Sequence, residues 1–478
     1  MPVPTAPAAA DAATPVTTTA DPTAPAQAAT GTPEGTPAAA DTDHPLTLSP
    51  PRAVYGSVWD RIRAGFKLPD IEDPLVRKWE NFYAARPDYW ARINERSKRY
   101  LFFITSEIER RGMPLEIALL PIIESAYNPE ALSRARASGI WQFVPATGKI
   151  YGLQQNWWLD DRRDVTVATG SALDYLEKLY AMFGDWQLAL ASYNWGEGAV
   201  QRAVGRNLAK HKPTDYASLK VPTETRNYLP KLQAVKNLIL APEKFGLTLP
   251  DVPDRPYFAT VTTARQIDVA LAARLADMPV EDFKTLNPAH NRPVLAGASE
   301  QRIIVPYDKA ETFVMNLDAY EFPLVSWRPY QLKSGERLEQ VAPRFGIGVD
   351  ELKRVNGLTG HKRIVPGHTL LVPARGGETL TDPLPVALFK EAPNDGPGWH
   401  KVRRGETLAA IADRYGVTAA EIRRLNGLQG NSVSAGRRLR LNDSVNARSA
   451  QGSVSSHVRH KAAKRGIKKK PVKPTRRR

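Results

Sequence analysis

The strongest constraint on the fold of this chain is an internal repeat in its second half. Two segments share one pattern, YQLKSGERLEQVAPRFGIGVDELKRVNGL at 330–358 and HKVRRGETLAAIADRYGVTAAEIRRLNGL at 400–428. A glycine and a short apolar strand close each unit, which indicates strand, helix, helix and strand within about 45 residues. A period this short predicts small separate modules, not one continuous core.

A weaker third copy precedes the two clear ones. Its FKTLNP motif contains Asn287, which lies 69 residues before Asn356. The spacing is nearly the same in the two clear copies, where 70 residues separate Asn356 from Asn426. The glycine of the first turn is missing in this copy. We therefore expect a degenerate repeat at 255–308, modules at 328–374 and 399–443, and a linker rich in Pro and Gly at 375–398.

The two ends of the chain differ in composition from the rest. Residues 1–50 are mainly Ala, Pro and Thr, and cannot bury enough apolar surface to offset their ordering entropy, so we expect a disordered arm. Residues 444–478 are expected to form a disordered basic tail that is attracted to anionic envelope polymers or lipid. Since this tail contains no aromatic residue for base stacking, no specific nucleic acid is expected as a partner.

Several classes of protein are excluded by what the chain lacks. It contains no cysteine, which excludes disulfides, a thiolate nucleophile and cysteine-ligated metals and, in the chain as given, a lipid anchor on cysteine. The histidines have no ligand spacing and no phosphate-binding glycine motif occurs, so neither metal nor cofactor is expected. No apolar run is long enough to span a membrane, and no targeting signal is visible at the start.

The region between the arm and the repeats has helical periodicity. We expect residues 51–245 to form one all-α domain, with its core at about 105–235. A clear apolar stripe at helical spacing consists of Leu173, Leu176, Leu179, Tyr180 and Phe183. The chain is therefore predicted to be multidomain, with an all-α domain followed by small α+β modules and with disordered termini.

Glu124 is the candidate catalytic group. Pro114 is predicted to open a helix on which Ile117, Leu120 and Glu124 follow at i, i+3 and i+7, so Glu124 shares an apolar face. Burial there would raise the pKa of its carboxyl, as a general acid near neutral pH requires. The alternative is that Glu124 ends its helix in solvent or against backbone amides, and that Pro121 bends the helix and changes the face.

Three motifs carry a family resemblance: ESAYNP at 124–129, SGIWQF at 138–143 and ALASYNWGEG at 189–198. They resemble the soluble lytic transglycosylase domain, whose fold is similar to goose-type lysozyme. The longer strings RGMPLEIALLPIIESAYNP and YNWGEGAVQRA are similar to the membrane-bound D type of this family. The two clear repeats resemble LysM modules, which bind glycans that contain N-acetylglucosamine.

The resemblance implies an all-α lysozyme-like catalytic domain that cleaves peptidoglycan without water. Glu124 would act as acid and then as base, and the product would carry 1,6-anhydro-N-acetylmuramic acid. Ordinary glycosidases use two carboxylates. The candidates for a second one are Asp160, Asp161 and Asp164, although helix capping and pairing with the neighbouring arginines are expected for them.

The resemblance also assigns substrate-binding residues in the catalytic domain. These positions match polar or aromatic residues of the family: Ser125, Ser133, Gln142, Tyr193, Asn194 and Tyr228. The alternatives are local bonding for Ser125, a buried amide for Gln142 and a core aromatic for Tyr193. In the LysM modules the family's glycan groove implicates Gly335, Asn356, Gly405 and Asn426. Asparagine at this turn is otherwise expected to serve the fold by bonding backbone.

Together these features predict an enzyme of the bacterial cell envelope, in the periplasm, whose partners are peptidoglycan glycan strands. The absent lipobox cysteine is a departure from many relatives of the D type. Two other functions stay open at this point. They are a hydrolytic muramidase, which requires a working second carboxylate, and a non-catalytic scaffold that binds the cell wall through its LysM modules.

Overall fold

The computed structural model describes residues 55–133, 135–358, 364–374, 383–391, 399–415 and 419–441. The predicted arm at 1–50 and the predicted tail at 444–478 lie outside the described residues. The chain divides into two compact units, Met1–Pro393 and Asn394–Arg478, which are described separately. Within the described part, no helix has both the length and the apolar character needed to cross a membrane.

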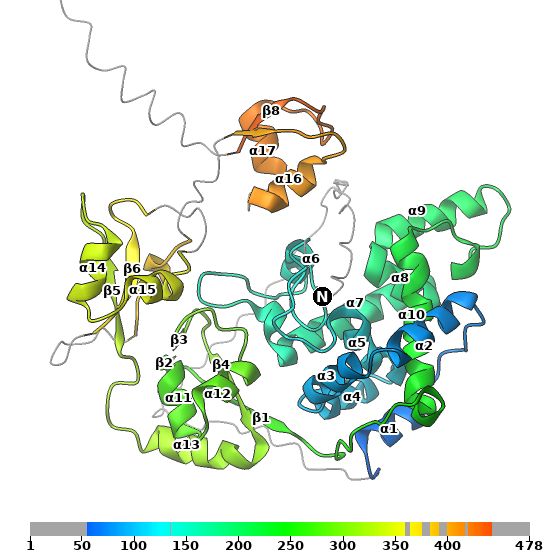
Figure 1. Ribbon diagram of the computed structural model, residues 1–478, viewed down its shortest axis with the longest axis horizontal. Helices are drawn as coiled ribbons and strands as arrows, with labels where there is room; N and C mark the ends of the chain where they lie inside the picture. The colour runs from blue at the N-terminus through cyan, green and yellow to red at the C-terminus, as the bar shows by residue number, and fades with distance from the viewer. Residues whose placement is uncertain are drawn as a thin grey trace, which may run out of the picture. The chain divides into compact units, whose positions relative to one another are not determined.

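The first part of the larger unit is helical (Figure 1). Short 3₁₀ helices connect some of its helices, at η1 (Leu115–Leu119), η2 (Asp161–Arg163), η3 (Tyr216–Ser218) and η4 (Pro242–Phe245). The α-helices are α1 (Val58–Ala64), α2 (Pro74–Ala84), α3 (Pro87–Ser97), α4 (Leu101–Arg110), α5 (Leu120–Ser125), α6 (Pro145–Ile150), α7 (Val165–Phe183), α8 (Trp186–Trp195), α9 (Glu197–Leu208) and α10 (Thr223–Leu240). The prediction of an all-α domain followed by small α+β modules is confirmed.

The predicted stripe on α7 is buried only in part. Leu173, Leu176 and Leu179 have no exposed surface, whereas Tyr180 is 40% exposed and stacks on Trp186. The helix begins where the Asp164 carboxylate accepts hydrogen bonds from the backbone of its first turn. The apolar spacing therefore identifies the buried face of α7 from Leu173 to Leu179 but not beyond it.

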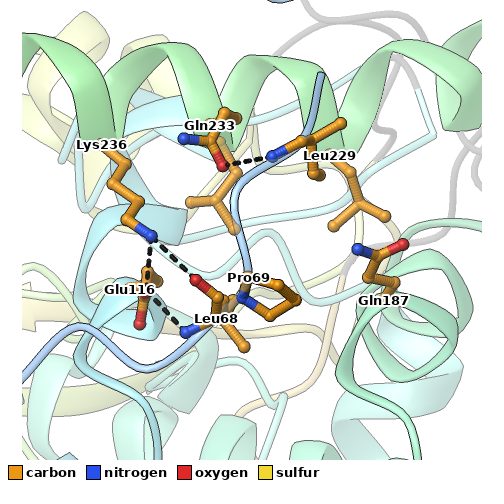
Figure 2. Close-up of a pocket in the computed structure, with 9 residues that line it drawn as sticks. Leu68, Pro69, Glu116, Gln187, Leu229, Gln233 and Lys236 are labelled. Atoms are coloured by element: carbon orange, nitrogen blue, oxygen red, sulfur yellow. Dashed lines mark hydrogen bonds and ion pairs between the residues drawn. The ribbon is translucent and has the colours of Figure 1, made fainter. Parts of the chain in front are cut away.

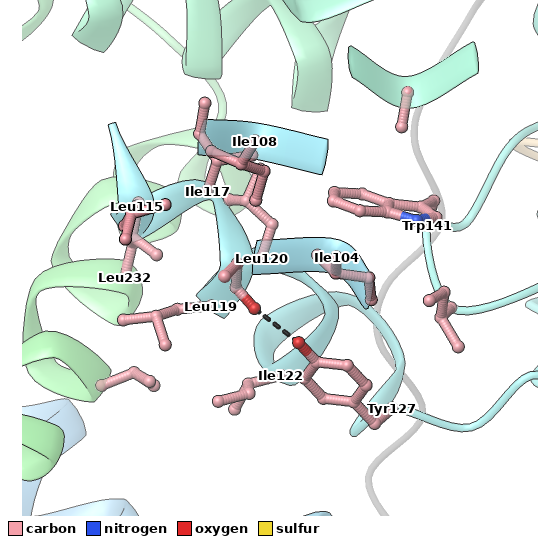
Figure 3. Close-up of a cluster of buried hydrophobic side chains, with 14 of the residues drawn as sticks. Ile104, Ile108, Leu115, Ile117, Leu119, Leu120, Ile122, Tyr127, Trp141 and Leu232 are labelled. Carbon is pink, nitrogen blue, oxygen red and sulfur yellow. Dashed lines mark hydrogen bonds between the residues drawn. The ribbon is translucent and has the colours of Figure 1, made fainter. Parts of the chain in front are cut away.

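The core of this domain surrounds the short segments that carry Glu124. Figure 3 shows the buried side chains of α4, η1 and α5 together with Trp141. The Tyr127 hydroxyl donates to the carbonyl of Ala118 (2.6 Å), and Trp141 Nε1 donates to Thr169 Oγ1 (3.0 Å). Both aromatic residues thus satisfy their polar atoms inside the core, which holds the chain on either side of Glu124.

The continuous helix predicted from Pro114 is wrong. Residues 115–119 form the 3₁₀ helix η1 with Pro114 as its N-cap, and the α-helix α5 begins only at Leu120. Pro121 lies in the first turn of α5, where its missing N–H does not interrupt a helical hydrogen bond. Ala126 then adopts a left-handed backbone with φ of +53° and ends the helix. Glu124 consequently stands near the end of one short turn of helix.

Three βααβ units follow the helical domain. In the degenerate repeat β1 (Phe258–Thr263) pairs with β4 (Gln301–Pro306), and β2 (Ile267–Asp268) pairs with β3 (Val294–Leu295), all antiparallel. The helices of this repeat are α11 (Val269–Leu275), α12 (Val280–Leu286) and α13 (Ala310–Asp318). The first module has β5 (Trp327–Gln331), α14 (Leu338–Arg344), α15 (Val349–Val355) and β6 (Thr369–Pro373). The second module, in the smaller of the two compact units, has β7 (Trp399–Lys401), α16 (Leu408–Tyr415), α17 (Ala419–Asn426) and β8 (Arg438–Arg440).

The repeated asparagines clip a helix to a strand in all three units. Asn356 donates to the carbonyls of Leu352 and Leu371 (both 2.9 Å) and accepts from the Leu371 amide (2.7 Å). Asn287 and Asn426 make the same three bonds in their own units. Both amide donors are used in each case, so these side chains serve the fold and have none left for a glycan.

An aromatic cluster joins separate segments of the larger unit. Trp157 and Trp158 pack against residues of the degenerate repeat, of the first module and of the stretch 383–391, namely Val294, Ala296, Val355, Leu371, Leu384 and Phe389. The ring centroid of Phe389 lies 5.0 Å from the centroid of each tryptophan. Residues 383–391, which fall within the predicted linker, therefore pack on the helical domain. Residues 375–382 and 392–398 lie outside the described part.

Replacing Phe389 by Ala is expected to loosen residues 383–391. Phe389 is 4% exposed, and the loss of a buried phenyl ring costs about 3 kcal/mol, or about a hundredfold in local opening. Hydrogen exchange of the Leu388 and Phe389 amides measures this opening. Leu388→Ala is the matched control, because Leu388 is 54% exposed. Equal exchange in the two variants would contradict the packing role of Phe389.

Candidate active site

Glu124 meets a tyrosine from a distant helix. The hydroxyl of Tyr228, on α10, donates to Glu124 Oε1 at 2.6 Å, although 104 residues separate the two positions. Tyr228 is buried, whereas Glu124 keeps part of its surface open to solvent. The carboxyl is therefore held in one orientation on a residue that is not fully enclosed, as a group that transfers protons to a ligand must be.

The surroundings of Glu124 favour its neutral form. Burial is the largest effect and raises the pKa of the carboxyl to about 7. The Tyr228 hydrogen bond and the positive charge of Lys231 oppose this rise, and the negative charge of Glu224 adds to it. The site thus has a carboxyl that can both give and take a proton near neutral pH.

Tyr193 and Asn194 lie in the same region but bond to other groups. The Tyr193 hydroxyl donates to the carbonyl of Trp141 at 2.8 Å, and not to Glu124. The negative charge of Glu124 adds to burial in raising the pKa of Tyr193 well above its usual value. Asn194 Oδ1 accepts from Thr225 Oγ1 (2.9 Å), which ties the end of α8 to the start of α10. Both residues thus support the walls around Glu124.

Ser125, Ser133 and Gln142 organise the SGIWQF loop. Ser125 Oγ donates to the carbonyl of Ile140 (3.0 Å), and Ser133 Oγ accepts from the Ala137 amide (3.0 Å). Gln142 has a φ of +52° and donates to the carbonyl of Gly139 (2.8 Å). The Gln142 side chain is partly exposed, and its oxygen has no hydrogen bond among the described residues, so it can still accept one from a ligand.

The SGIWQF loop requires a glycine at position 139. Its φ is +83°, and a Cβ atom there would lie 1.8 Å from the carbonyl oxygen of Arg162. No other residue can occupy this position without moving the backbone of residues 162–163. The loop that carries Gln142 is therefore packed closely on the turn before α7.

The three aspartates near residue 160 have structural partners. Asp160 binds the Arg162 side chain (2.9 and 2.7 Å), and Asp164 caps α7. Burial raises the pKa of Asp161 to about 6, and Arg302 of the degenerate repeat lies 3.3 Å from its carboxylate. These contacts join the helical domain to the next unit. The carboxylate that acts on Glu124 is instead Glu224.

Sequence reasoning missed Glu224 and Lys231. Together with Tyr228 they follow at i, i+4 and i+7 along α10, the spacing that places side chains on one face of a helix. Burial raises the pKa of Glu224, and the nearby Asn194 side chain opposes the rise. The signal was present in the sequence as ETRNYLPK, but only the contact of Tyr228 with Glu124 identifies which face of α10 matters.

A buried ion pair between η1 and α10 lines a small cavity (Figure 2). Lys236 Nζ lies 3.2 Å from Glu116 Oε1, and it donates to the carbonyl of Leu68 at 2.9 Å. The cavity measures about 20 Å³, which is room for one water molecule and not for a sugar. Among the residues that the structure describes, no three His, Asp or Glu side chains are grouped to hold a metal ion.

Family models match four stretches of the chain. Residues 102–215 match the transglycosylase SLT domain, and residues 257–321 match the LysM-like domain of lytic transglycosylase MltD. The LysM domain matches residues 330–373 and 400–442. Tyr228, Glu224 and Lys231 lie beyond the SLT match, so part of the wall around Glu124 comes from outside it.

One relative matches most of the chain, and two further matches cover about a quarter of it. The chain is 33% identical to membrane-bound lytic murein transglycosylase D of Escherichia coli strain K12 over 383 residues, which are 78% of this chain and 82% of that protein. It is 29% identical over 127 residues to N-acetylmuramoyl-L-alanine amidase sle1 of Staphylococcus aureus strain USA300, 26% of this chain and 36% of the amidase. A crystal structure of the Bacillus cereus spore cortex-lytic enzyme SleL matches at 21% sequence identity with a TM-score of 0.10. This match covers 25% of this chain and 23% of the SleL chain.

Proposed function

This chain belongs to the family of lytic murein transglycosylase D, and from that premise we propose how its active site works. It is a lytic transglycosylase with LysM modules that bind peptidoglycan. We propose that it cleaves the β-1,4 bond between N-acetylmuramic acid and N-acetylglucosamine and leaves 1,6-anhydro ends. Its place would be the bacterial cell envelope, on the periplasmic side.

Glu124 would serve twice in one turnover. Its protonated carboxyl gives a proton to the glycosidic oxygen as the C1–O4 bond breaks. The resulting carboxylate takes the proton of the muramoyl C6 hydroxyl as O6 bonds to C1, so no water is consumed. The observation that carries this proposal is the Glu124 carboxyl, which Tyr228 holds at 2.6 Å and whose pKa burial raises to about 7, on a residue that keeps part of its surface exposed.

The rival function, a hydrolytic muramidase, needs a second carboxylate to activate water. Asp160, Asp161 and Asp164 are occupied by capping, backbone bonds or arginine pairing. Glu224 acts on Glu124 only as a neighbouring charge. These contacts favour chemistry in which a single glutamate is used twice.

The mass of the products tests the proposal directly. Purified murein sacculi are digested, and the soluble muropeptides are compared with those from a hydrolytic muramidase. We expect each product of this enzyme to be lighter by one water and to lack a reducing end. Products with ordinary reducing ends would instead make it a muramidase, with Glu224 as the first carboxylate to examine.

Replacing Tyr228 by Phe is expected to move the alkaline limb of the pH–rate profile to higher pH. The hydroxyl stabilises the charged carboxylate, so its loss raises the pKa of Glu124 further. The acid form that starts the reaction then persists to higher pH, while the maximal rate falls by about tenfold with the lost bond to a charged group. Rates of sacculus solubilisation across pH measure both effects.

Tyr193→Phe is the matched control for this shift. It removes a hydroxyl that donates to the Trp141 carbonyl and not to Glu124, so the alkaline limb is expected to stay in place. Equal movement in both variants would contradict a specific effect of Tyr228 on the acid.

The modules would tether the enzyme to its polymeric substrate. We propose that the catalytic domain spans about 51–245, with modules at 328–374 and 399–443, and that glycan contacts involve the turns at Gly335 and Gly405. Both glycines have a left-handed backbone, with φ of +81° and +83°. Tethering raises the local concentration of glycan strands even if each module binds weakly.

A further inference from the structure

We propose that Lys231, supported by the ring of Trp79, binds a carboxylate of the peptide that murein carries on its muramoyl sugars. This subsite lies beside Glu124, and it rests on the proposed function. Murein glycan strands are neutral along their sugar backbone, whereas their peptides carry free carboxylates. A cation next to the cleavage site would therefore distinguish strands that carry peptides from strands that do not.

The position of Lys231 follows from its place on α10. Tyr228 and Lys231 are three residues apart, so both project from one side of the helix, and the Tyr228 hydroxyl contacts Glu124. Trp79 of α2 packs on the same stretch, because its Nε1 donates to Asn227 Oδ1 at 2.9 Å. The ammonium of Lys231 lies 4.7 Å from the centroid of the Trp79 ring. The aromatic ring thus holds the cation at the edge of the site.

Among the described residues, Lys231 has no acceptor for the protons of its ammonium. It is partly buried, yet it makes no hydrogen bond and no ion pair with any residue that the structure describes. Burial lowers the pKa of its ammonium, and the charges of Glu124 and Glu224 only partly compensate, while Lys78 opposes them. An ammonium desolvated in this way gains most from a ligand that brings an anionic oxygen.

A second lysine on the same helix shows what a satisfied ammonium looks like. Lys236 lies five residues further along α10 and is bonded to the carbonyl of Leu68 (2.9 Å), to Asp70 (2.9 Å) and to Glu116 (3.2 Å). These three acceptors compensate the ammonium of Lys236 for the loss of water on burial. Lys231 has no such set, and it lies on the side of α10 that faces Glu124. This contrast favours a binding role for Lys231 over a structural one.

The alternative is that Lys231 only compensates the charges of Glu124 and Glu224. In that case its removal would change the acid for every substrate alike. A carboxylate subsite predicts a selective effect instead, because only substrates with peptides have the anion. A carboxylate subsite and simple charge compensation therefore predict different ratios of activity on strands with peptides and strands without them.

The test compares peptide-bearing glycan strands with the same strands after an amidase has removed their peptides. We expect wild type to have the higher kcat/KM on peptide-bearing strands, and Lys231→Met to lower the ratio of the two values by about tenfold. Lys231→Arg should keep most of the ratio, since it retains the cation. Lys78→Met is the matched control: it removes one charge, from an exposed lysine that lies 5.5 Å from the same ring.

Two results would overturn the proposal. One is a wild type that does not distinguish the two substrates. The other is a Lys231→Met variant that loses equal activity on both substrates and whose pH–rate profile has its alkaline limb at higher pH. That combination is expected if Lys231 acts only on the pKa of Glu124. Failure of the proposed function would show differently, as reducing ends on the products from either substrate. Thermal unfolding confirms that each variant is folded.

Discussion

A Glu124→Gln variant is expected to lose murein cleavage by a factor of about a hundred to ten thousand. Proton transfer by a positioned side chain contributes about that much to a rate, and an amide can neither give the proton nor take it back. The effect should appear in kcat, because the shape and the hydrogen-bonding capacity of the side chain are largely retained. Release of muropeptides from sacculi measures the loss. Turnover close to wild type would remove Glu124 from the mechanism.

The same variant is expected to be more stable than wild type at pH 8, but not at pH 4. The pKa of Glu124 is about 7 in the folded chain, above its ordinary value of 4.5. Wild type therefore loses folding free energy as the pH rises through this range, on the order of 1–3 kcal/mol, and glutamine does not. Thermal unfolding at the two pH values measures the difference. A variant less stable at pH 8 would contradict a carboxyl that burial keeps neutral.

Lys236→Met is expected to have the largest effect on stability, about 3–5 kcal/mol. Glu116 and Lys236 are 1% and 8% exposed, so removing the lysine leaves a carboxylate buried without its cation. The pair ties η1 to α10 and thereby fixes α5, with Glu124, against Tyr228. We expect lower activity along with lower stability. Chemical denaturation measures the free energy of unfolding.

Lys98→Met provides the comparison for a surface pair. Lys98 bonds to Glu95 three residues earlier on α3, with both side chains well exposed, so its loss should cost about 0.5 kcal/mol or less. A double variant, Glu116→Leu with Lys236→Met, should recover part of the lost stability. The recovery stays partial because the amides of Lys67 and Leu68 lose their acceptor. Equal losses at Lys98 and Lys236 would contradict the role of burial.

The repeats were open to sequence reasoning because their rules are local. Each clear repeat needs a glycine in a left-handed turn and an asparagine that bonds a helix to a strand. These residue types therefore recur at a fixed spacing in the sequence. Asn287 keeps this mark in the degenerate copy, where the first glycine is missing. The spacing of asparagines therefore located three βααβ units without any knowledge of their packing.

One expectation failed because packing overrides periodicity, and one stretch makes contacts that its composition did not reveal. The stripe of Ile117, Leu120 and Glu124 assumed one continuous helix, but η1 and α5 meet at Leu120, before Pro121. The Pro- and Gly-rich stretch at 375–398 resembled a linker by composition. Its described part buries Leu384 and Phe389 against two tryptophans more than 200 residues earlier. Composition carries no information about such distant partners.

By itself, the sequence determined the order of the units, the helical and βααβ character of each, the family, and Glu124 as the candidate acid. Only the tertiary structure decided that Tyr228 holds this acid, that Tyr193 does not, and that Glu224 and Lys231 set its charge environment. The reason is physical. Helical periodicity and turns arise between neighbours along the chain, whereas a pKa depends on burial and on charges that approach through space.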